Sequence, residues 1–230
     1  MPMSASRNRL IVAVDLSDPV AAEALAARLS GMVAFLKVGL ELFTAGGPDA
    51  VVRLRPHAPV FLDLKLHDIP NTVERAAANG ARLGVELLTV HALGGPAMVA
   101  AAVAGSERGA ADAGFDPPAV LGVTVLSSLA GERLESAASL AYEAVASGAA
   151  GVVVSGEDVG TVREALGQDP LIVVPGIRPG GQPANDHVRP LSPGEALERG
   201  ADLIVVGRPV TASADPAGAA RAVLRETRIE

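Results

Sequence analysis

The two lysines of this chain are the first residues whose chemistry stands out. Of its 19 Lys and Arg residues only Lys37 and Lys65 are lysine, and the other 17 are arginine. In a chain that uses arginine wherever positive charge alone suffices, a retained lysine indicates a different task, because a guanidinium hardly releases its proton whereas an ammonium group can. We therefore interpret Lys37 and Lys65 as candidate catalytic groups.

Carboxylates accompany both lysines. The sequence around Lys65 alternates as a strand does, which places Asp63, Lys65 and His67 on one face and the intervening leucines on the other. Asp15 lies near the end of the first apolar run of the chain, and Lys37 lies in the second. We expect these charges to converge. A structural ion-pair network is the alternative, but burying charge costs several kcal/mol per ion unless the charges are paired. An active site is therefore the preferred interpretation.

Eight apolar runs are positioned to carry these residues. We predict strands at residues 10–16, 33–40, 60–66, 87–91, 119–126, 151–155, 171–175 and 203–207. We predict helices at residues 20–29, 48–54, 72–83, 97–108, 134–146, 159–166, 193–198 and 217–226. Near-continuous Val, Ile and Leu runs are typical of parallel strands that are covered on both faces.

Eight strand–helix units in this length predict a single-domain (β/α)8 TIM barrel. Residues 1–9 are expected to form an N-terminal tail, and residues 10–230 the catalytic barrel. A doubly wound open sheet is the alternative. It is less favoured because no GxGxxG motif follows the first strand and the chain contains no Walker loop.

Two loops of the predicted barrel have the composition of a phosphate site. Residues 175–179 (Pro-Gly-Ile-Arg-Pro) follow the seventh strand, and residues 207–209 (Gly-Arg-Pro) follow the eighth. These loops commonly bind phosphate in such barrels. Glycine lets backbone amides approach an anion. The guanidinium groups of Arg178 and Arg208 can each bind two phosphate oxygens at once. A solvated loop arginine is the commoner alternative. The irregular segment 178–192 is predicted to be a mobile loop over the site.

Three further residues permit two interpretations each. Asp68 follows Lys65 by three positions, but it also precedes Pro70, which suits a first helical position, so a helix cap is the alternative. His91 ends the fourth strand and either lines the site or is a core histidine. Ser127 ends the fifth strand without an adjacent base, which indicates a hydrogen-bonding residue rather than a nucleophile.

Composition excludes several classes of protein. The chain has no cysteine, which excludes disulfide scaffolds and thiolate metal sites. Its net charge of −7 and its five aromatic residues argue against a nucleic-acid partner. Apolar runs of about eight residues are too short for a membrane helix, which needs about 20. Residues 1–9 also lack the apolar core of a signal peptide. We expect a cytoplasmic protein without a membrane partner.

Residues 63–72, Asp-Leu-Lys-Leu-His-Asp-Ile-Pro-Asn-Thr, resemble the D-x-K-x-x-D-I-P-N-T signature of the orotidine 5′-phosphate decarboxylase family. Segments 12–15, 36–39, 123–128, 176–179 and 207–211 also resemble that family, in its order. The resemblance implies conversion of orotidine 5′-phosphate to uridine 5′-phosphate and CO2, the last step of de novo UMP synthesis. It also implies a homodimer with shared active sites and no need for a metal or organic cofactor.

The resemblance also implies a role for each catalytic position. Lys65 would protonate C6 of the pyrimidine as CO2 departs, and Asp63 would lie against the substrate carboxylate and hold Lys65. Lys37 would bridge the carboxylates and a ribose hydroxyl, and Asp15 would bind the ribose. Asp68 would reach into the partner subunit's site.

Binding roles follow in the same way. Thr72, like Asp68, would reach into the partner's site, and Ser127 would meet the pyrimidine amide. Arg208 and the backbone of Gly207 would hold the phosphate beneath the loop that follows Arg178. That loop departs from the family pattern: Asn-Asp-His stands at residues 185–187 where the family commonly has Gly-Asp-Gln. Either His187 takes the role of the glutamine, or the displaced Gln182 does.

Two other functions are compatible with parts of this pattern. The D-x-K-x-x-D core is shared with metal-dependent sugar-phosphate decarboxylases and aldolases on the same barrel. A non-catalytic barrel that senses nucleotides would need the phosphate loops alone. The Ile-Pro-Asn-Thr extension argues against the first alternative, and the complete set of Asp63, Lys65 and Asp68 argues against the second.

Overall fold

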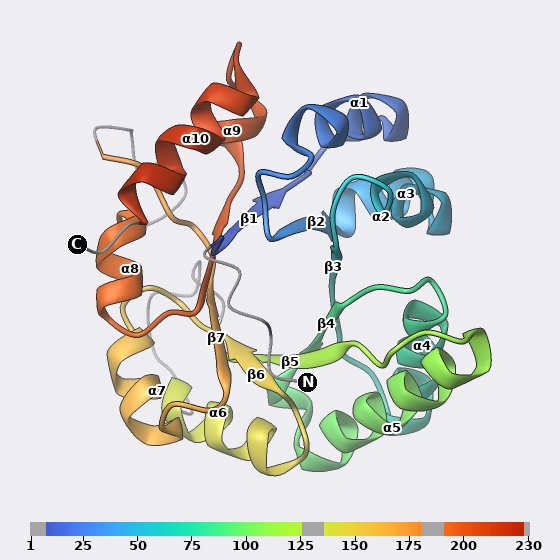
Figure 1. Ribbon diagram of the computed structural model, residues 1–230. Coiled ribbons are helices and arrows are strands. Elements are labelled where there is room, and N and C mark those ends of the chain that lie inside the picture. The colour runs from blue at the N-terminus through green and yellow to red at the C-terminus, as the bar shows by residue number, and fades with distance from the viewer. Residues whose placement is uncertain (1–7, 126–135, 181–190, 228–230) are drawn as a thin grey trace.

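A closed barrel of eight parallel strands forms the centre of the molecule (Figure 1). The structure is a computed structural model, and it describes residues 8–125, 136–180 and 191–227. Each strand pairs with the next along the chain, and β8 pairs with β1. The strands are β1 (Leu10–Ala13), β2 (Phe35–Gly39), β3 (Val60–Leu66), β4 (Leu87–His91), β5 (Ala119–Val123), β6 (Gly151–Val153), β7 (Leu171–Val174) and β8 (Leu203–Val206). The predicted (β/α)8 barrel is confirmed.

Helices surround the barrel on the outside (Figure 1). They are α1 (Pro19–Leu29), α2 (Leu40–Gly46), α3 (Pro48–Leu54), α4 (Pro70–Ala81), α5 (Pro96–Ala113), α6 (Ala137–Ala146), α7 (Val159–Leu166), α8 (Pro193–Glu198), α9 (Arg208–Thr211) and α10 (Pro216–Glu226), with a 3-10 turn η1 (Ala92–Gly94). Proline stands in the first turn of most of them, where its missing amide hydrogen costs nothing. Ser192 and Glu195 form a capping box at α8.

Alternate residues of the strands form two apolar layers. One layer fills the inside of the barrel, and Phe61 is its largest fully buried member. The other layer packs between the strands and the helices. Because both faces of every strand are covered, the sequence shows continuous apolar runs rather than alternation. The polar residues inside the barrel are therefore exceptions that need a reason.

Two details of the strands differ from the sequence prediction. The second strand ends at Gly39, and Leu40, predicted to be its last residue, begins α2 and is 57% exposed. Asp63 and Lys65 both line the cavity side and the intervening leucines pack on the outer layer, as predicted, but the backbone between them is not a regular strand. The pairing of β3 with β4 shifts register between Leu62 and Leu66, and Lys65 has a φ of 50°. A bulge of this kind re-aims side chains locally.

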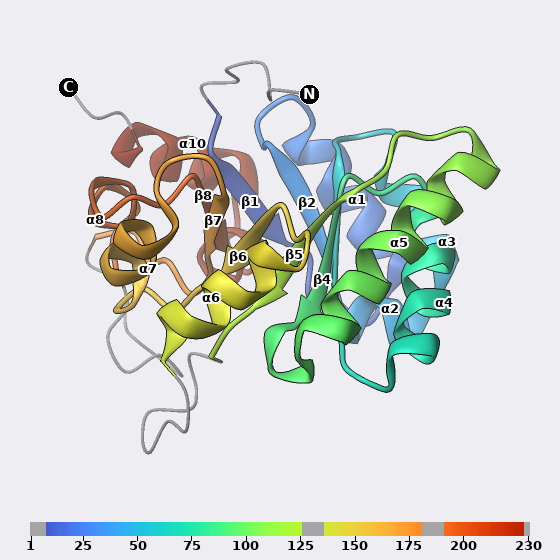
Figure 2. The same cartoon turned by 90° about the horizontal axis from the view of Figure 1, so that it is seen from below.

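Helices α4 and α5 lie side by side at unusually close range (Figure 2). A Cβ atom placed on Gly105 of α5 would lie 2.1 Å from the carbonyl oxygen of Glu74 in α4. One placed on Gly109 would lie 2.1 Å from the carbonyl oxygen of Ala78. The glycines of α5 therefore set the distance between the two helices.

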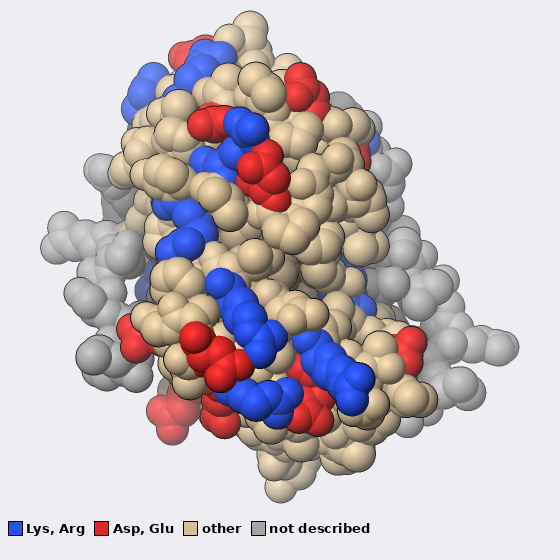
Figure 3. All heavy atoms as spheres, turned by 90° about the vertical axis from the view of Figure 1, so that its right-hand side faces the viewer, with Lys and Arg blue, Asp and Glu red and all other residues tan. Residues whose placement is uncertain are grey.

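The outer surface carries mixed charge. Figure 3 shows Lys and Arg intermixed with Asp and Glu on one side of the molecule. Ion pairs join neighbouring helices, among them Arg108 to Glu74 at 2.5 Å and Arg53 to Glu23 at 2.8 Å. This face has no continuous basic surface of the kind that nucleic acid requires. Within the described residues, no helix is long and apolar enough to cross a membrane.

Candidate active site

A cavity of about 290 Å³ lies at the carboxyl ends of the strands, where barrel enzymes have their active sites. Acidic and basic side chains from β1, β2 and β3, together with the loops after β7 and β8, meet in it. The lining residues are Ala13, Asp15, Lys37, Asp63, Lys65, Val123, Val125, Val153, Val154, Ser155, Pro175, Gly176, Ile177, Arg178, Val205, Gly207 and Arg208. Seven predicted site residues, from five separate strand ends, are thus brought together.

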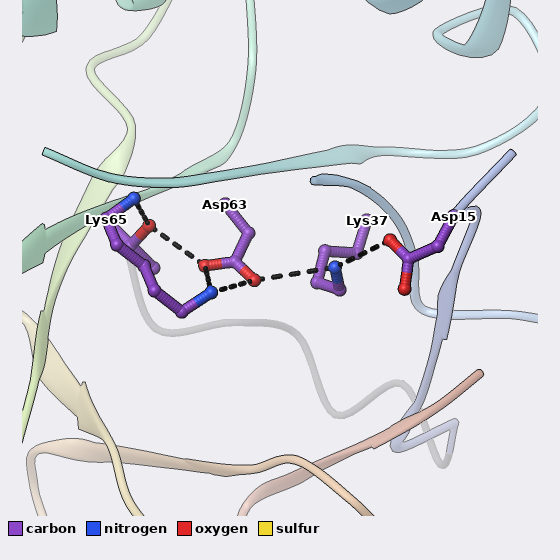
Figure 4. A network of polar contacts seen from close by, with 5 residues as sticks. Asp15, Lys37, Asp63 and Lys65 are labelled. Atoms are coloured by element: carbon purple, nitrogen blue, oxygen red, sulfur yellow. Dashed lines mark hydrogen bonds and ion pairs between the residues drawn. The ribbon is translucent and has the colours of Figure 1, made fainter. Parts of the chain in front are cut away.

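Four charged side chains form a chain of alternating sign along one wall (Figure 4). Lys65 Nζ lies 2.9 Å from Asp63 Oδ1 and 2.8 Å from Asp63 Oδ2. Lys37 Nζ lies 3.4 Å from Asp63 Oδ2 and 3.2 Å from Asp15 Oδ1. Each ammonium therefore contacts Asp63, and the convergence predicted from the sequence is present.

The pKa of Asp63 lies below its ordinary value. Burial alone raises this pKa, since Asp63 is only 7% exposed. The positive charges of Lys37 and Lys65, with hydrogen bonds from Lys65 and Thr89, outweigh the burial and lower it. Asp63 is therefore a fixed negative charge between two ammonium groups. An ion buried in this way is tolerated only because it is paired.

Thr89 was missed by the sequence analysis. Its hydroxyl accepts a hydrogen bond from the backbone amide of Lys65 at 2.8 Å and donates one to Asp63 Oδ1 at 3.0 Å. The available signal was its position: Leu87, Thr89 and His91 alternate along β4, and a threonine facing the barrel interior is polar where an apolar residue is expected.

Gly39 leaves space for the charged chain. A Cβ atom at this position would lie 2.9 Å from Asp15 Oδ1 and 2.9 Å from Lys37 Nζ. Any side chain would displace one or both groups. The glycine that ends β2 therefore permits the close approach of Asp15 and Lys37.

Two guanidinium groups lie on the other side of β1 from the two lysines. Arg178 follows β7, is 7% exposed, and donates its backbone amide to the carbonyl oxygen of Leu191 at 2.9 Å. That bond joins the two ends of the loop between β7 and α8. Arg208 begins α9 directly after Gly207. The cavity thus offers guanidinium groups for an anion on one side and an ammonium proton donor on the other.

Asp68 and Thr72 lie outside the cavity of their own chain. Both are exposed at the start of α4. Asp68 Oδ1 accepts a hydrogen bond from the amide of Ile69 at 2.7 Å, but the N-cap of α4 is Ile69 and no side chain caps the helix. The helix-cap interpretation of Asp68 is therefore wrong. Its carboxylate faces solvent three residues from Lys65 without joining the charged chain.

His91 stacks on His67 with ring centroids 5.1 Å apart. Its Nδ1 is buried and makes no hydrogen bond within the described part of the chain. Burial, together with positive charge on His67 and Lys65, lowers the pKa of His91. The imidazole does not line the cavity, so of its two interpretations the structure favours the core histidine.

Ser155 lines the cavity and was also missed by the sequence analysis. It follows β6, and its hydroxyl donates to Asp158 Oδ2 at 2.6 Å. A polar residue at the end of an apolar run was the available signal. Ser127, Gln182 and His187 lie outside the described residues. Across residues 8–125, 136–180 and 191–227, no three metal-ligating side chains come together.

Comparison with known proteins agrees with this geometry. Residues 8–223 match the model of the orotidine 5′-phosphate decarboxylase / HUMPS family. The orotidine 5′-phosphate decarboxylase of Syntrophotalea carbinolica is 47% identical, with 96% of this chain and 95% of that protein covered. That of Anaeromyxobacter sp. strain K is 49% identical, with 94% and 96% covered. A crystal structure of the Lactobacillus acidophilus orotidine 5′-phosphate decarboxylase, 39% identical, matches with a TM-score of 0.83 over 96% of this chain and all of that one. The chain therefore belongs to the orotidine 5′-phosphate decarboxylase family.

Proposed function

We propose that this chain decarboxylates orotidine 5′-phosphate to uridine 5′-phosphate and CO2, the last step of de novo UMP synthesis. The observation that carries the proposal is a row of ion-paired side chains on the wall of the cavity, Asp15, Lys37, Asp63 and Lys65. The same cavity also contains Arg178 and Arg208. Family membership with near-complete coverage of relatives of that name supports it.

The reaction requires stabilisation of negative charge on carbon. When the bond from C6 to the carboxylate breaks, CO2 leaves and the electron pair remains on a ring carbon without a ready electron sink. A fixed array of charges in a site that excludes water stabilises such a transition state. The ammonium of Lys65 supplies positive charge beside C6 and then its proton, forming the C6–H bond. Lys65 regains a proton from solvent after product release.

The other charged side chains of the site, Asp63, Lys37 and Asp15, fix the position of Lys65. Asp63 contacts both ammonium groups, which fixes the position of Lys65 Nζ beside the reacting carbon. Lys37 and Asp15 form an ion pair, and we propose that this pair binds the ribose hydroxyls. Because these groups are held by one another before substrate binds, little reorganisation is needed during the reaction.

The phosphate is assigned to the loops after β7 and β8. We assign Arg208, the backbone of Gly207 and Arg178, all of which line the cavity, to binding it. Interactions with this distant group can drive closure of the site around the ring. We also assign Ser127 to the pyrimidine amide, and either His187 or Gln182 to the role of the family's glutamine.

A homodimer completes the proposed site. Asp68 and Thr72 of one subunit contribute to the site of the other. Three large apolar side chains after neighbouring strands support such an interface: Leu40 is 57% exposed, Ile69 65% and Leu93 50%. Apolar side chains exposed together along one rim indicate a surface that another protein covers. We place the enzyme in the cytoplasm.

A decarboxylation assay tests the proposal directly. Purified protein is incubated with orotidine 5′-phosphate in excess chelator, and loss of the orotate-ring absorbance is followed. We expect full turnover without added metal. Turnover that disappears in chelator and returns with a divalent ion would favour the metal-dependent alternative, and tight binding without turnover would favour the nucleotide sensor. A Lys65→Ala protein purified in parallel controls for a contaminating host enzyme.

A further inference from the structure

Thr89 is a hydroxyl in an otherwise apolar part of the barrel interior. It lies in the middle of β4 with no exposed surface. Its inward neighbours Leu87 and Phe61 belong to the apolar layer that fills the barrel. A buried hydroxyl is retained at low cost only where it makes hydrogen bonds. The partners of Thr89 therefore explain its presence.

Thr89 forms hydrogen bonds with both members of the catalytic pair, Asp63 and Lys65. Thr89 Oγ1 lies 2.8 Å from the backbone nitrogen of Lys65 and 3.0 Å from Asp63 Oδ1. The amide of Lys65 supplies its own hydrogen, so the oxygen of Thr89 accepts there. The single hydroxyl hydrogen is then directed at the carboxylate of Asp63. One side chain thus fixes the backbone of Lys65 and the carboxylate that holds its ammonium group.

The backbone of Lys65 needs such a contact. Residues Leu62 and Leu66 of β3 pair with Leu88 and Val90 of β4, so the β3 segment between them contains two extra residues. Within that bulge Lys65 has a φ of 50°, the one positive φ of a non-glycine residue in the described part of the chain. Such a conformation persists only where surrounding contacts enforce it.

We propose that Thr89 is a positioning residue for the decarboxylation: it holds the bulged backbone of Lys65 and the carboxylate of Asp63 in the relative orientation that aims the ammonium group at C6. The inference rests on the proposed function of Lys65. Thr89 does not line the cavity, so it acts through these two residues rather than on the substrate.

The test compares three variants by kcat and KM. Thr89→Val keeps the shape and removes both hydrogen bonds, and we expect kcat to fall about 10- to 100-fold, because a misplacement of about 1 Å can cost on the order of 10² in rate. KM should stay within about threefold, since phosphate binding is untouched. Thr89→Ser keeps the hydroxyl and should retain kcat within about threefold.

Thr124→Val is the matched control. Thr124 follows β5, has no exposed surface, and donates to the carbonyl oxygen of Val153 at 3.2 Å, away from the catalytic pair. Thr124→Val also removes a buried threonine hydroxyl, but its kcat should equal that of the wild type. A kcat for Thr89→Val within twofold of the wild type, or an equal loss in Thr124→Val, overturns the proposal. So does an equal loss in Thr89→Ser.

Two further measurements keep the result decisive. If Thr89→Val does not fold, Thr89→Cys is compared with Thr89→Ser, because they differ in one atom and a thiol is a weak donor. Equal kcat in this pair overturns the proposal. Hydrogen exchange of the Lys65 amide should be at least about tenfold faster in Thr89→Val than in the wild type, since its acceptor is lost. Unchanged exchange overturns the positioning role. An inactive wild type would defeat the proposed function, and the exchange measurement would still decide the role of Thr89.

Discussion

At the scale of single residues, chemistry depends on the ammonium group of Lys65. Its Nζ is the proton donor of the proposed reaction and is held by both oxygens of Asp63. We expect Lys65→Ala to lower kcat by at least the factor of about 10²–10⁴ that a positioned general acid supplies. Lys65→Arg should be nearly as inactive, since guanidinium hardly releases its proton.

Measuring product binding shows whether Lys65→Ala has lost only its catalytic step or also its binding site. The phosphate loops remain intact in Lys65→Ala, so affinity for uridine 5′-phosphate should stay within about tenfold of the wild type. Calorimetric titration measures it. A folded Lys65→Ala protein with near-normal kcat would contradict the assignment of the proton donor.

His91 gives a pH dependence at the same scale. Burial first, and then the positive charges of His67 and Lys65, lower the pKa of His91 in the folded protein. Below the ordinary value of 6.5 the unfolded chain therefore binds a proton that the folded protein does not. Stability from this group is complete above pH 6.5 and is lost as the pH falls toward the folded pKa.

Replacing the imidazole tests this dependence. His91→Phe keeps a ring against His67 but cannot titrate. The free energy of unfolding, measured from pH 7.5 downward through 6.5, should fall less steeply for His91→Phe than for the wild type. Parallel pH profiles for the two proteins would show that His91 does not contribute.

Residue identity was predictable from the sequence where composition marked it, and backbone strain was not. The scarcity of lysine pointed to Lys37 and Lys65, and alternation placed Asp63 beside them. The φ of 50° at Lys65 had no such signal, because it depends on how β3 pairs with β4. The sequence marked Thr89 only as a polar residue in an apolar strand, and its contacts with Lys65 and Asp63 depend on the same register.

At the scale of elements, the contact between α4 and α5 sets the position of the segment that carries Asp68. The backbones approach where Gly105 and Gly109 lack side chains. In Gly105→Ala the new methyl group would meet the carbonyl oxygen of Glu74 at 2.1 Å, so the helices must separate. We expect a loss of about 1–3 kcal/mol in the free energy of unfolding, typical of overpacking.

Gly160→Ala is the control for this substitution. Gly160 lies in α7, and a Cβ atom there would meet nothing within 4 Å. Alanine should stabilise that helix by about 0.5–1 kcal/mol, the ordinary difference in helix propensity. Denaturant unfolding measures both variants. If Gly105→Ala were as stable as Gly160→Ala, helices α4 and α5 would be able to move apart without cost, and the prediction would be wrong.

The strands and most of the helices were predictable from the sequence, and three short elements were not. The eight apolar runs correspond to the eight strands, since a parallel strand covered on both faces needs continuous apolar residues. Two short helices, α3 and α8, have the predicted bounds 48–54 and 193–198. The short elements α2, η1 and α9 were missed because so few residues carry little periodic signal. Gly39 ends β2 early because Leu40 begins α2, which the apolar pattern does not distinguish.

At the scale of the whole molecule, the cavity of the chain contains Asp15, Lys37, Asp63 and Lys65 but lacks Asp68. The carboxylate of Asp68 is exposed beside Ile69, on the rim where large apolar side chains also face outward. A twofold dimer would cover these side chains and could bring Asp68 into the neighbouring site. Each site would then need Lys65 from one chain and Asp68 from the other.

Mixing two inactive variants tests that arrangement. Lys65→Ala and Asp68→Asn homodimers should each be strongly impaired. In a mixed dimer the Asp68→Asn chain supplies Lys65, and the Lys65→Ala chain supplies an intact Asp68 to the same site. Random exchange makes about half of the dimers mixed, with one restored site in each, so about a quarter of all sites should regain full activity.

A second mixture distinguishes sharing from a general effect of exchange. Asp63 contacts Lys65 within one chain, with Nζ 2.8 Å from Oδ2. Mixing Lys65→Ala with Asp63→Asn can therefore restore no site, because neither chain supplies both groups to its own cavity. Recovery in the first mixture and none in the second would establish that Asp68 acts across the interface. Equal behaviour of the two mixtures, with subunit exchange verified by native mass spectrometry, would mean that Asp68 acts within its own chain or not at all.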